Sequence, residues 1–188
     1  MQMSINHLGH FLLTGLLLPQ LKHAKGRIVI HASSMALPPF GLDTSDLNWT
    51  RREYSPIMAY VATKRANVLF THSLNERLKG TGVTATCAHP GATGTELQGK
   101  ATGLSASNRD LLVTLAKSVM MLPDQGVLSL LRAAVEAPPD KAVGPLFVAF
   151  GAPIILGNSL QVIRPFGASQ KDAESLWEQS EKLTGINY

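Results

Sequence analysis

The chain has 188 residues, of which 45% are hydrophobic, and its mean hydropathy is +0.09. This length and composition favour one globular domain with a single core and exclude a disordered chain. The 17 Lys and Arg and the 13 Asp and Glu give a net charge of +4, and the basic residues are scattered along the chain. Proteins that bind nucleic acid usually carry clustered basic residues, so we expect no nucleic-acid partner.

The cysteine count and the apolar stretch near the N-terminus indicate in which cellular compartment we expect the protein. Cys87 is the single cysteine, which excludes a disulfide within the chain and fits a reducing compartment. The apolar stretch at residues 11–18 has no basic leader and is too short to span a bilayer. We therefore expect a cytoplasmic protein with neither a signal peptide nor a membrane span.

The first predicted element is a helix over residues 4–22, in which Pro19 is expected to bend or loosen the last turn. Its expected buried stripe is formed by Ile5, Leu8, Leu12, Leu16 and Leu21. The β-branched residues at 27–32 then predict a buried strand that leads to Ser33 and Ser34. Residues 35–54 have no sustained period and predict a long loop, which in a compact domain is usually a functional lid or disordered.

A second helix is predicted from Ser55 to Gly80. Ser55 suits the N-cap, Pro56 suits the first helical position, and Gly80 suits the far end. The expected buried stripe is formed by Ala62, Ala66, Phe70, Leu74 and Leu78. On this helix Tyr60 and Lys64 stand four residues apart and therefore share one face.

The second half of the chain continues the alternation of helices and strands. The predicted segments are a strand at 83–87 followed by His89-Pro90-Gly91, a loop at 92–109, helices at 111–121 and 123–135, a strand at 144–150 and a helix at 169–183. This order predicts an α/β fold, a partial doubly wound, Rossmann-like parallel sheet with flanking helices, formed by residues 1–188 as a single domain. Ligands of such sheets bind outside the carboxyl ends of the strands, where Ser33 and Pro90-Gly91 fall.

Tyr60 and Lys64 form a candidate acid/base pair. A cationic ammonium beside a phenol favours the phenolate, which helps a tyrosine exchange protons near neutral pH. A lone Tyr-x-x-x-Lys also occurs by chance on solvated helices, so the pair alone does not decide between an enzyme and an ordinary helix surface. The convergence of this pair with Ser33 and Pro90-Gly91 at one edge favours a functional site.

Four segments, in this order, carry a family resemblance. They are NHLGHF at 6–11, GRIVIHAS at 26–33, YVATKRANVLF at 60–70 and HPGATGT at 89–95. Together they resemble the short-chain dehydrogenase/reductase family, and the insert before Tyr60 with Asp46-Leu47-Asn48 resembles its retinol-dehydrogenase-like branch. The resemblance implies an NAD(P)-dependent oxidoreductase that interconverts an alcohol and a ketone or aldehyde on a lipophilic small molecule.

The resemblance also implies residue roles. Tyr60 would be the general acid/base, Lys64 would favour its phenolate and hydrogen-bond the nicotinamide ribose, Ser33 would hydrogen-bond the substrate oxygen, and Asn6 would hold a water in a proton relay. The implied cofactor-binding residues are Tyr60, Lys64, Pro90, Gly91 and Thr95. Taken alone, Ser33 is equally an ordinary strand-end serine, and Asn6 a polar residue at a helix start.

The resemblance covers the C-terminal half of the family's fold. The Gly-rich turn that cradles the cofactor pyrophosphate does not occur in this sequence, nor does the residue that chooses between NAD and NADP, although the resemblance slightly favours NADP. The alternative is therefore a truncated, catalytically silent interaction module, in which exposed faces of the Asn6 and Tyr60 helices pair with a partner. In this family those helices form a homodimer interface, so we expect a homodimer.

We expect no metal site. His7 and His10 stand three residues apart on one helix, but no carboxylate or third ligand is patterned beside them. Cys87 lies within a predicted strand, where a small buried residue is a better interpretation than a nucleophile.

Overall fold

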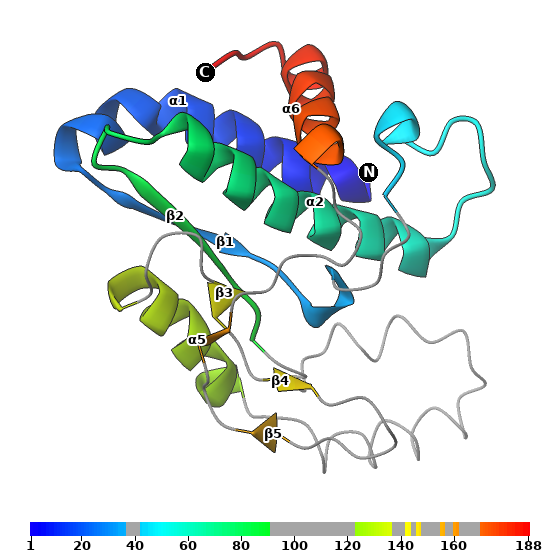
Figure 1. The fold of residues 1–188 in the computed structure, drawn as a ribbon. Helices are drawn as coiled ribbons and strands as arrows, with labels where there is room; N and C mark the ends of the chain where they lie inside the picture. Colours follow the sequence, from blue (N-terminus) through cyan, green and yellow to red (C-terminus); the bar gives the residue numbers. More distant parts are fainter. Residues whose placement is uncertain are drawn as a thin grey trace.

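The computed structural model describes residues 1–36, 42–90, 123–136, 142–143, 146–147, 155–156, 160–161 and 170–188. Figure 1 shows their arrangement. The elements in chain order are η1 (Ser4–Leu8), α1 (Gly9–Ala24), β1 (Arg27–His31), η2 (Ser34–Ala36), η3 (Thr44–Asp46), α2 (Pro56–Arg77), β2 (Thr84–Ala88), α5 (Pro123–Val135), β3 (Ala142–Val143), β4 (Leu146–Phe147), β5 (Ile155–Leu156), β6 (Leu160–Gln161) and α6 (Gln170–Thr184).

The main sheet has the strand order β1-β2-β3-β6, so β1 lies at its margin in the described structure. β1, β2 and β3 run parallel, and β6 pairs antiparallel with β3. Helices α1 and α2 lie on one side of β1 and β2, and α5 lies on the other (Figure 1). The predicted α/β class, with helices flanking a parallel sheet, is confirmed.

The predicted strand at 144–150 is confirmed in part, at Leu146–Phe147, while the other residues of this range lie outside the described residues. The strand that joins the main sheet is Ala142–Val143, whereas Leu146–Phe147 pairs with Ile155–Leu156 in a separate sheet. Pro145 has no backbone N–H to donate to a ladder, which works against one continuous strand through this segment. The predicted helix at 111–121 and the predicted loop at 92–109 lie outside the described residues.

The buried face of the first helix also differs from the prediction. Leu8 is buried as expected, but Ile5 and Leu16 are 63% and 60% exposed. The side chains buried instead are those of Met3, His7, Phe11, Thr14 and Leu18. Because leucines occur on several faces of this helix, the apolar pattern leaves its rotation ambiguous. The helix continues through Pro19 to Ala24 and ends at Lys25, whose φ of 48° is left-handed.

Helix α2 is confirmed, including its cap, since the Ser55 hydroxyl accepts a hydrogen bond from the Met58 N–H at 3.4 Å. The whole predicted stripe is buried. Every residue from Val61 to Thr71 is in fact buried, because the sheet, η1, η2 and α6 all pack on this helix. The expectation that the Tyr60 helix presents an exposed face to a partner is therefore wrong for this stretch.

An aromatic cluster joins the C-terminal helix to the rest of the core. The Phe11 ring lies 4.9 Å from the rings of both Trp177 and Tyr188 and 5.3 Å from Phe70, between ring centroids. Aromatic pairs at these distances add to the stabilisation from burial itself. α6 ends before Gly185, whose φ of 73° is a left-handed conformation that glycine adopts readily at helix ends. Each helix in the described ranges is too short or too polar to traverse a bilayer.

Part of the predicted long loop is organised around the buried carboxylate of Asp46. This carboxylate accepts hydrogen bonds from the N–H groups of Thr50 at 2.8 Å and Arg51 at 3.2 Å, and Arg52 lies 3.6 Å away. The hydrogen bonds from Thr50 and Arg51, led by that of the Thr50 N–H, and the charge of Arg51 hold the pKa of the Asp46 carboxyl below its usual value. Residues 42–54 thus form a fixed turn, while 37–41 lie outside the described residues.

Candidate active site

Tyr60 and Lys64 lie one turn apart on α2, as predicted. The Lys64 side chain is buried, with its ammonium 5.6 Å from the centroid of the half-buried Tyr60 ring. Burial lowers the pKa of Lys64, because a charged amine loses hydration there. The two side chains are therefore placed together, in surroundings that strengthen their interaction.

The Lys64 ammonium is anchored on the end of β1. Its Nζ lies 3.2 Å from the backbone oxygen of His31 and 3.2 Å from His31 Nδ1. His31 is the last residue of the strand, so these contacts hold the ammonium at the carboxyl edge of the sheet. Ligands bind at this edge in doubly wound folds.

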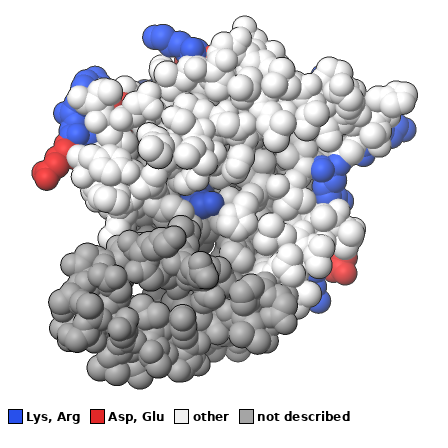
Figure 2. Space-filling view, turned by 180° about the vertical axis from the view of Figure 1, so that it is seen from behind, with Lys and Arg blue, Asp and Glu red and all other residues white. Residues whose placement is uncertain are grey.

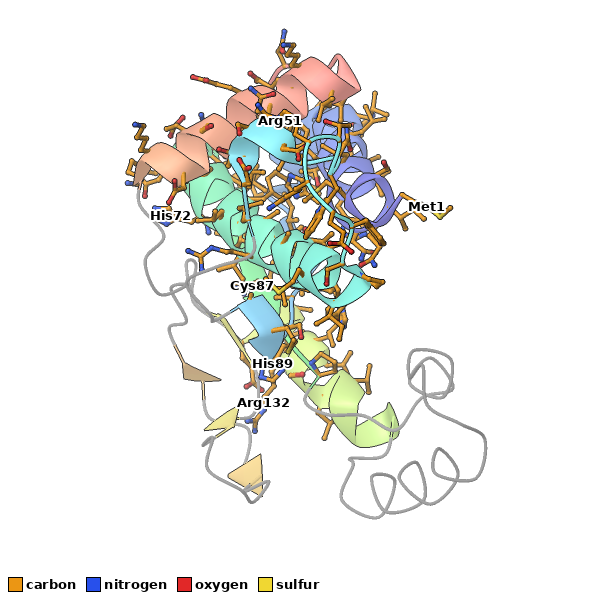
Figure 3. The ribbon with its side chains drawn as sticks, turned by 90° about the vertical axis from the view of Figure 1, so that its right-hand side faces the viewer. Met1, Arg51, His72, Cys87, His89 and Arg132 are labelled. Carbon is orange, nitrogen blue, oxygen red and sulfur yellow. The ribbon has the colours of Figure 1, made fainter. Side chains whose placement is uncertain are left out.

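The His31 imidazole lies among basic groups. Burial is the main cause that lowers its pKa to about 4, and the charges of Lys64, His10 and His89 act in the same direction. His89 follows β2 and lies toward α5 at the same edge of the sheet (Figure 3). His31 is therefore neutral at physiological pH.

A buried series of hydrogen bonds supports the His31 carbonyl that Lys64 contacts. The Asn67 amide nitrogen donates to the His31 oxygen at 3.1 Å, and the Asn67 amide oxygen lies 3.3 Å from His7 Nδ1. His7 Nε2 lies 2.9 Å from the hydroxyl of Ser180 on α6. Since Asn67 presents its NH₂ to the His31 oxygen, its amide oxygen faces His7 Nδ1, which carries the proton of the neutral ring. The Ser180 hydroxyl beside Nε2 also lies 2.7 Å from the Leu176 oxygen, so its one proton has two acceptors within reach.

Asn6 approaches α2 through Thr63. The Asn6 amide donates to the Thr63 hydroxyl at 3.3 Å, and that hydroxyl donates to the Tyr60 backbone oxygen at 2.8 Å. Asn6 lies in η1, a π-helical turn closed by a bond from the Gly9 N–H to the Ser4 oxygen. Such turns shift the side chains of a helix out of their regular positions and are frequent at functional sites.

Ser33 and Pro90 follow the ends of β1 and β2. The Ala32 N–H donates to the Ala88 oxygen at 2.7 Å, so the two strand ends lie side by side. The Ser33 hydroxyl accepts from the Met35 N–H at 3.2 Å, in the turn that packs on α2. Both residues are half-buried at the predicted edge, and their roles remain predictions.

The structure thus brings Asn6, Tyr60 and Lys64 together along one stretch of α2 and places Ser33 and Pro90 at the neighbouring sheet edge. Gly91 and Thr95, the other two residues predicted to bind the cofactor, lie outside the described residues. The sequence interpretation did not identify His31, Thr63 and Asn67 as residues of the candidate site. The polar His31 at the end of an otherwise apolar strand was a usable signal, whereas Thr63 and Asn67 look like ordinary helix residues.

The other polar candidates have structural explanations. Both nitrogens of His7 are engaged by Asn67 and Ser180, and burial lowers its pKa to about 4. In the described ranges, no three His, Cys, Asp or Glu side chains are grouped as metal ligands would be. Cys87 is buried, as predicted, and burial raises the pKa of its thiol to about 12.

The fold is α/β, with a Tyr and a Lys one helical turn apart, the Lys bonded to the carboxyl end of a parallel strand, and an Asn bonded to the same helix. This combination defines a dehydrogenase-like class of domain. No family model matches the chain. Over 99% of its length it is 36% identical to human retinol dehydrogenase 13 and 34% identical to human retinol dehydrogenase 12, and it covers 54% of each. It is also 34% identical, over 97% of its length, to bovine dehydrogenase/reductase SDR family member 13, of which it covers 46%.

A solved structure agrees with these relatives. The crystal structure of an uncharacterized protein from Mycobacterium paratuberculosis matches 99% of this chain with a TM-score of 0.74 and 36% sequence identity. The match covers 59% of that protein. The chain belongs to the short-chain dehydrogenase/reductase family, in its retinol-dehydrogenase-like branch, and spans about half the length of the curated relatives it matches.

Proposed function

We propose that this chain carries the proton-transfer half of an NAD(P)-dependent oxidoreductase that interconverts an alcohol and a carbonyl group on a lipophilic small molecule. The observation that carries the proposal is the anchoring of Lys64 on the His31 carbonyl, one turn from Tyr60, at the carboxyl edge of the sheet. The named relatives are retinol dehydrogenases, which makes a retinoid a reasonable first substrate to test.

The described residues fit the nicotinamide end of a cofactor. An ammonium has three N–H donors, and within the described part of the chain two of them point to the His31 oxygen and Nδ1. The third is suited to a ribose hydroxyl, and Pro90 lies at the adjoining strand end. When bound, the nicotinamide supplies the hydride that is exchanged with the substrate carbon. The resemblance slightly favours NADP over NAD.

Residues of this chain would transfer the proton to and from the substrate oxygen. Tyr60 would donate its phenolic proton to the carbonyl oxygen in reduction, or take the hydroxyl proton in oxidation, while Ser33 hydrogen-bonds the same oxygen. The Lys64 ammonium, 5.6 Å from the centroid of the Tyr60 ring, is the cation beside this phenol. Asn6, held by Thr63 next to the Tyr60 turn, would place a water that returns a proton from solvent.

A chimera tests this assignment. The nucleotide-binding first half of human retinol dehydrogenase 13 is joined to residues 1–188, and oxidation of NADPH or NADH is followed with retinal and with a panel of aliphatic aldehydes. Turnover is expected, and Tyr60→Phe should lower it by about a thousandfold or more, while cofactor affinity changes little. Tyr54→Phe, at an exposed tyrosine outside α2, is the matched control.

Two results would contradict the proposal. Retained turnover in the Tyr60→Phe chimera would remove Tyr60 as the acid/base. A folded chimera that binds cofactor, shown by a rise in its melting temperature, yet turns over none of the substrates would contradict the assignment of a complete proton-transfer half.

A second candidate function is association with another copy of the chain, because α1 leaves an apolar stripe uncovered. Ile5, Leu13, Leu16 and Leu17 are between 45% and 63% exposed. On one face of the described surface, charged side chains are few and stand mainly near the margins (Figure 2). Exposed apolar patches of this kind mark association surfaces. A homodimer through α1 would cover the stripe.

Light scattering coupled to size-exclusion chromatography tests this second candidate. The expected result is a dimer that Leu13→Glu together with Leu16→Glu converts to a monomer, while Lys22→Glu on the same helix leaves it dimeric. A monomer at all concentrations, or a dimer that survives both leucine substitutions, would exclude the α1 surface.

A further inference from the structure

The contact between Lys64 and the His31 ring defines the protonation state of the ring. The two nitrogens, Lys64 Nζ and His31 Nδ1, lie 3.2 Å apart. An ammonium only donates hydrogen bonds, so His31 Nδ1 must accept with its lone pair. A protonated imidazole has N–H groups at both positions and cannot accept. The contact therefore requires neutral His31 with its proton on Nε2.

The backbone of His31 makes this arrangement more specific. The same residue offers two acceptors to one ammonium, its ring Nδ1 and its carbonyl oxygen. The carbonyl also accepts from Asn67, which is fixed by the buried His7. Two acceptors from one rigid strand end restrict where the long, flexible lysine side chain can place its Nζ.

Protonation of His31 would oppose the contact. The titratable groups that act on the His31 ring are Lys64 on α2, His10 on α1 and His89 after β2, and each of them is a cation when protonated. A proton taken from solvent onto His31 Nδ1 would replace the acceptor with a donor and place two cations in contact. The ammonium would then have to leave the ring.

We propose that His31 is the positioning residue of Lys64: its neutral ring and its carbonyl hold the ammonium beside Tyr60, and protonation of the ring releases it. The consequence for turnover rests on the function proposed above, whereas the tautomer and the contact do not. In this proposal His31 acts through Lys64, which it contacts with both its ring and its carbonyl. Its removal should affect turnover more than substrate binding.

The first test uses residues 1–188 without cofactor. In ¹⁵N-labelled protein, long-range ¹H–¹⁵N correlation spectra report which ring nitrogen carries the proton. At pH 7 we expect an unprotonated Nδ1 and a protonated Nε2 on His31, with exposed His23 as the internal reference. In Lys64→Met the His31 ring should titrate at a higher pH, because a neighbouring cation is lost. A proton on His31 Nδ1 at pH 7, or no change in Lys64→Met, would overturn the proposal.

The second test uses the active chimera and its pH profile. His31→Leu removes the ring acceptor and should lower kcat by about tenfold or more, the usual effect of losing one hydrogen bond to a charged group, with KM nearly unchanged. His31→Asn keeps a neutral acceptor that does not titrate, so it should recover part of the loss and remove the acid limb of the profile. A folded His31→Leu chimera with the turnover and acid limb of the parent would overturn the proposal. If the chimera is inactive, the proposed function fails, and the spectra alone decide the positioning role.

Discussion

The hydroxyl of Ser180 lies 2.9 Å from Nε2 of His7, which joins the C-terminal helix to the first turn of the chain. Both side chains are fully buried. His7 also contacts Asn67, and Asn67 donates to the His31 carbonyl. The contact with Ser180 is therefore the last in the series of hydrogen bonds that supports the carbonyl to which Lys64 is bonded. Helix α6 therefore supports the candidate site indirectly, although none of its residues was predicted to act there.

Burial of His7 predicts a stability that depends on pH. Its pKa is lowered to about 4 in the folded chain, mainly by burial, against about 6.5 when unfolded. At pH values between 4 and 6.5, His7 is protonated in the unfolded chain and neutral in the folded chain. The free energy of unfolding therefore falls as the pH drops from 6.5 toward 4. One such group gives a slope of about 1.4 kcal/mol per pH unit, on the order of 3 kcal/mol in all.

Urea denaturation at several pH values between 7 and 4 measures this slope. His7→Gln keeps a polar side chain that does not titrate, and its slope should be smaller by about 1.4 kcal/mol per pH unit. Some slope should remain, because the pKa of His31 is lowered in the same direction. His23→Gln, at an exposed position of α1, is the control. Equal slopes in the His7→Gln variant and the parent chain would contradict the assignment.

Asn75 fastens α2 to β2 through both backbone groups of one residue. Its amide donates to the Ala85 oxygen at 2.7 Å and accepts from the Ala85 N–H at 2.8 Å, in a buried position. Asn75→Ala would leave both groups unpaired, so we expect a loss of about 2–5 kcal/mol in the free energy of unfolding. Glu76→Ala, which breaks an exposed ion pair with Lys79, should cost about 1 kcal/mol or less. Similar losses in the two variants would disprove the role of Asn75.

Gly15 provides the space for the C-terminal tail. A Cβ at this position would lie 2.6 Å from the Tyr188 ring and 2.8 Å from Ile186 Cδ1. In the full chain Gly15→Ala should therefore lower the melting temperature. In a chain that ends at residue 185 the same substitution should raise stability, by up to about 1 kcal/mol, because alanine favours the helix. Calorimetry of the four proteins checks this, and the same sign in both backgrounds would refute it.

The thiol of Cys87 should be inert in the folded protein. Burial raises its pKa to about 12, so almost none of the reactive thiolate is present at pH 8. A colorimetric disulfide reagent should react with one thiol per chain in urea and with almost none in buffer, at a rate set by unfolding. Rapid reaction without denaturant would show that the thiol is accessible.

The sequence was most informative where local chemistry and tertiary packing agree. Ser55 and Pro56 specified the start of α2 to the residue, whereas the helix ends at Arg77, before the predicted Gly80. The ordered motifs located Tyr60, Lys64 and the two strand ends. These features depend on caps, on helical period and on the rule that parallel strands end at one edge, all of which are legible along the chain.

The remaining features depend on contacts between distant residues. The rotation of α1 is decided by the aromatic rings of Phe70 and Trp177, which receive Phe11, and not by the leucines of its own pattern. The sequence indicates a surface or a core histidine at position 7, and the partner that decides between the two, Ser180, lies 173 residues away on α6. Likewise, the support given to Lys64 by His31 joins a strand to a helix across a long loop, so no local period predicts it.

The enclosure of α2 on every side between Val61 and Thr71 has a consequence for binding. A helix held between a sheet, two turns and another helix can neither rotate nor slide without opening the core. Tyr60, at the edge of this enclosed stretch, and Lys64 within it are therefore held in place before any ligand arrives, so little conformational entropy would be lost if they bind one. The amide hydrogens of this stretch should accordingly be among the slowest in the chain to exchange with deuterium.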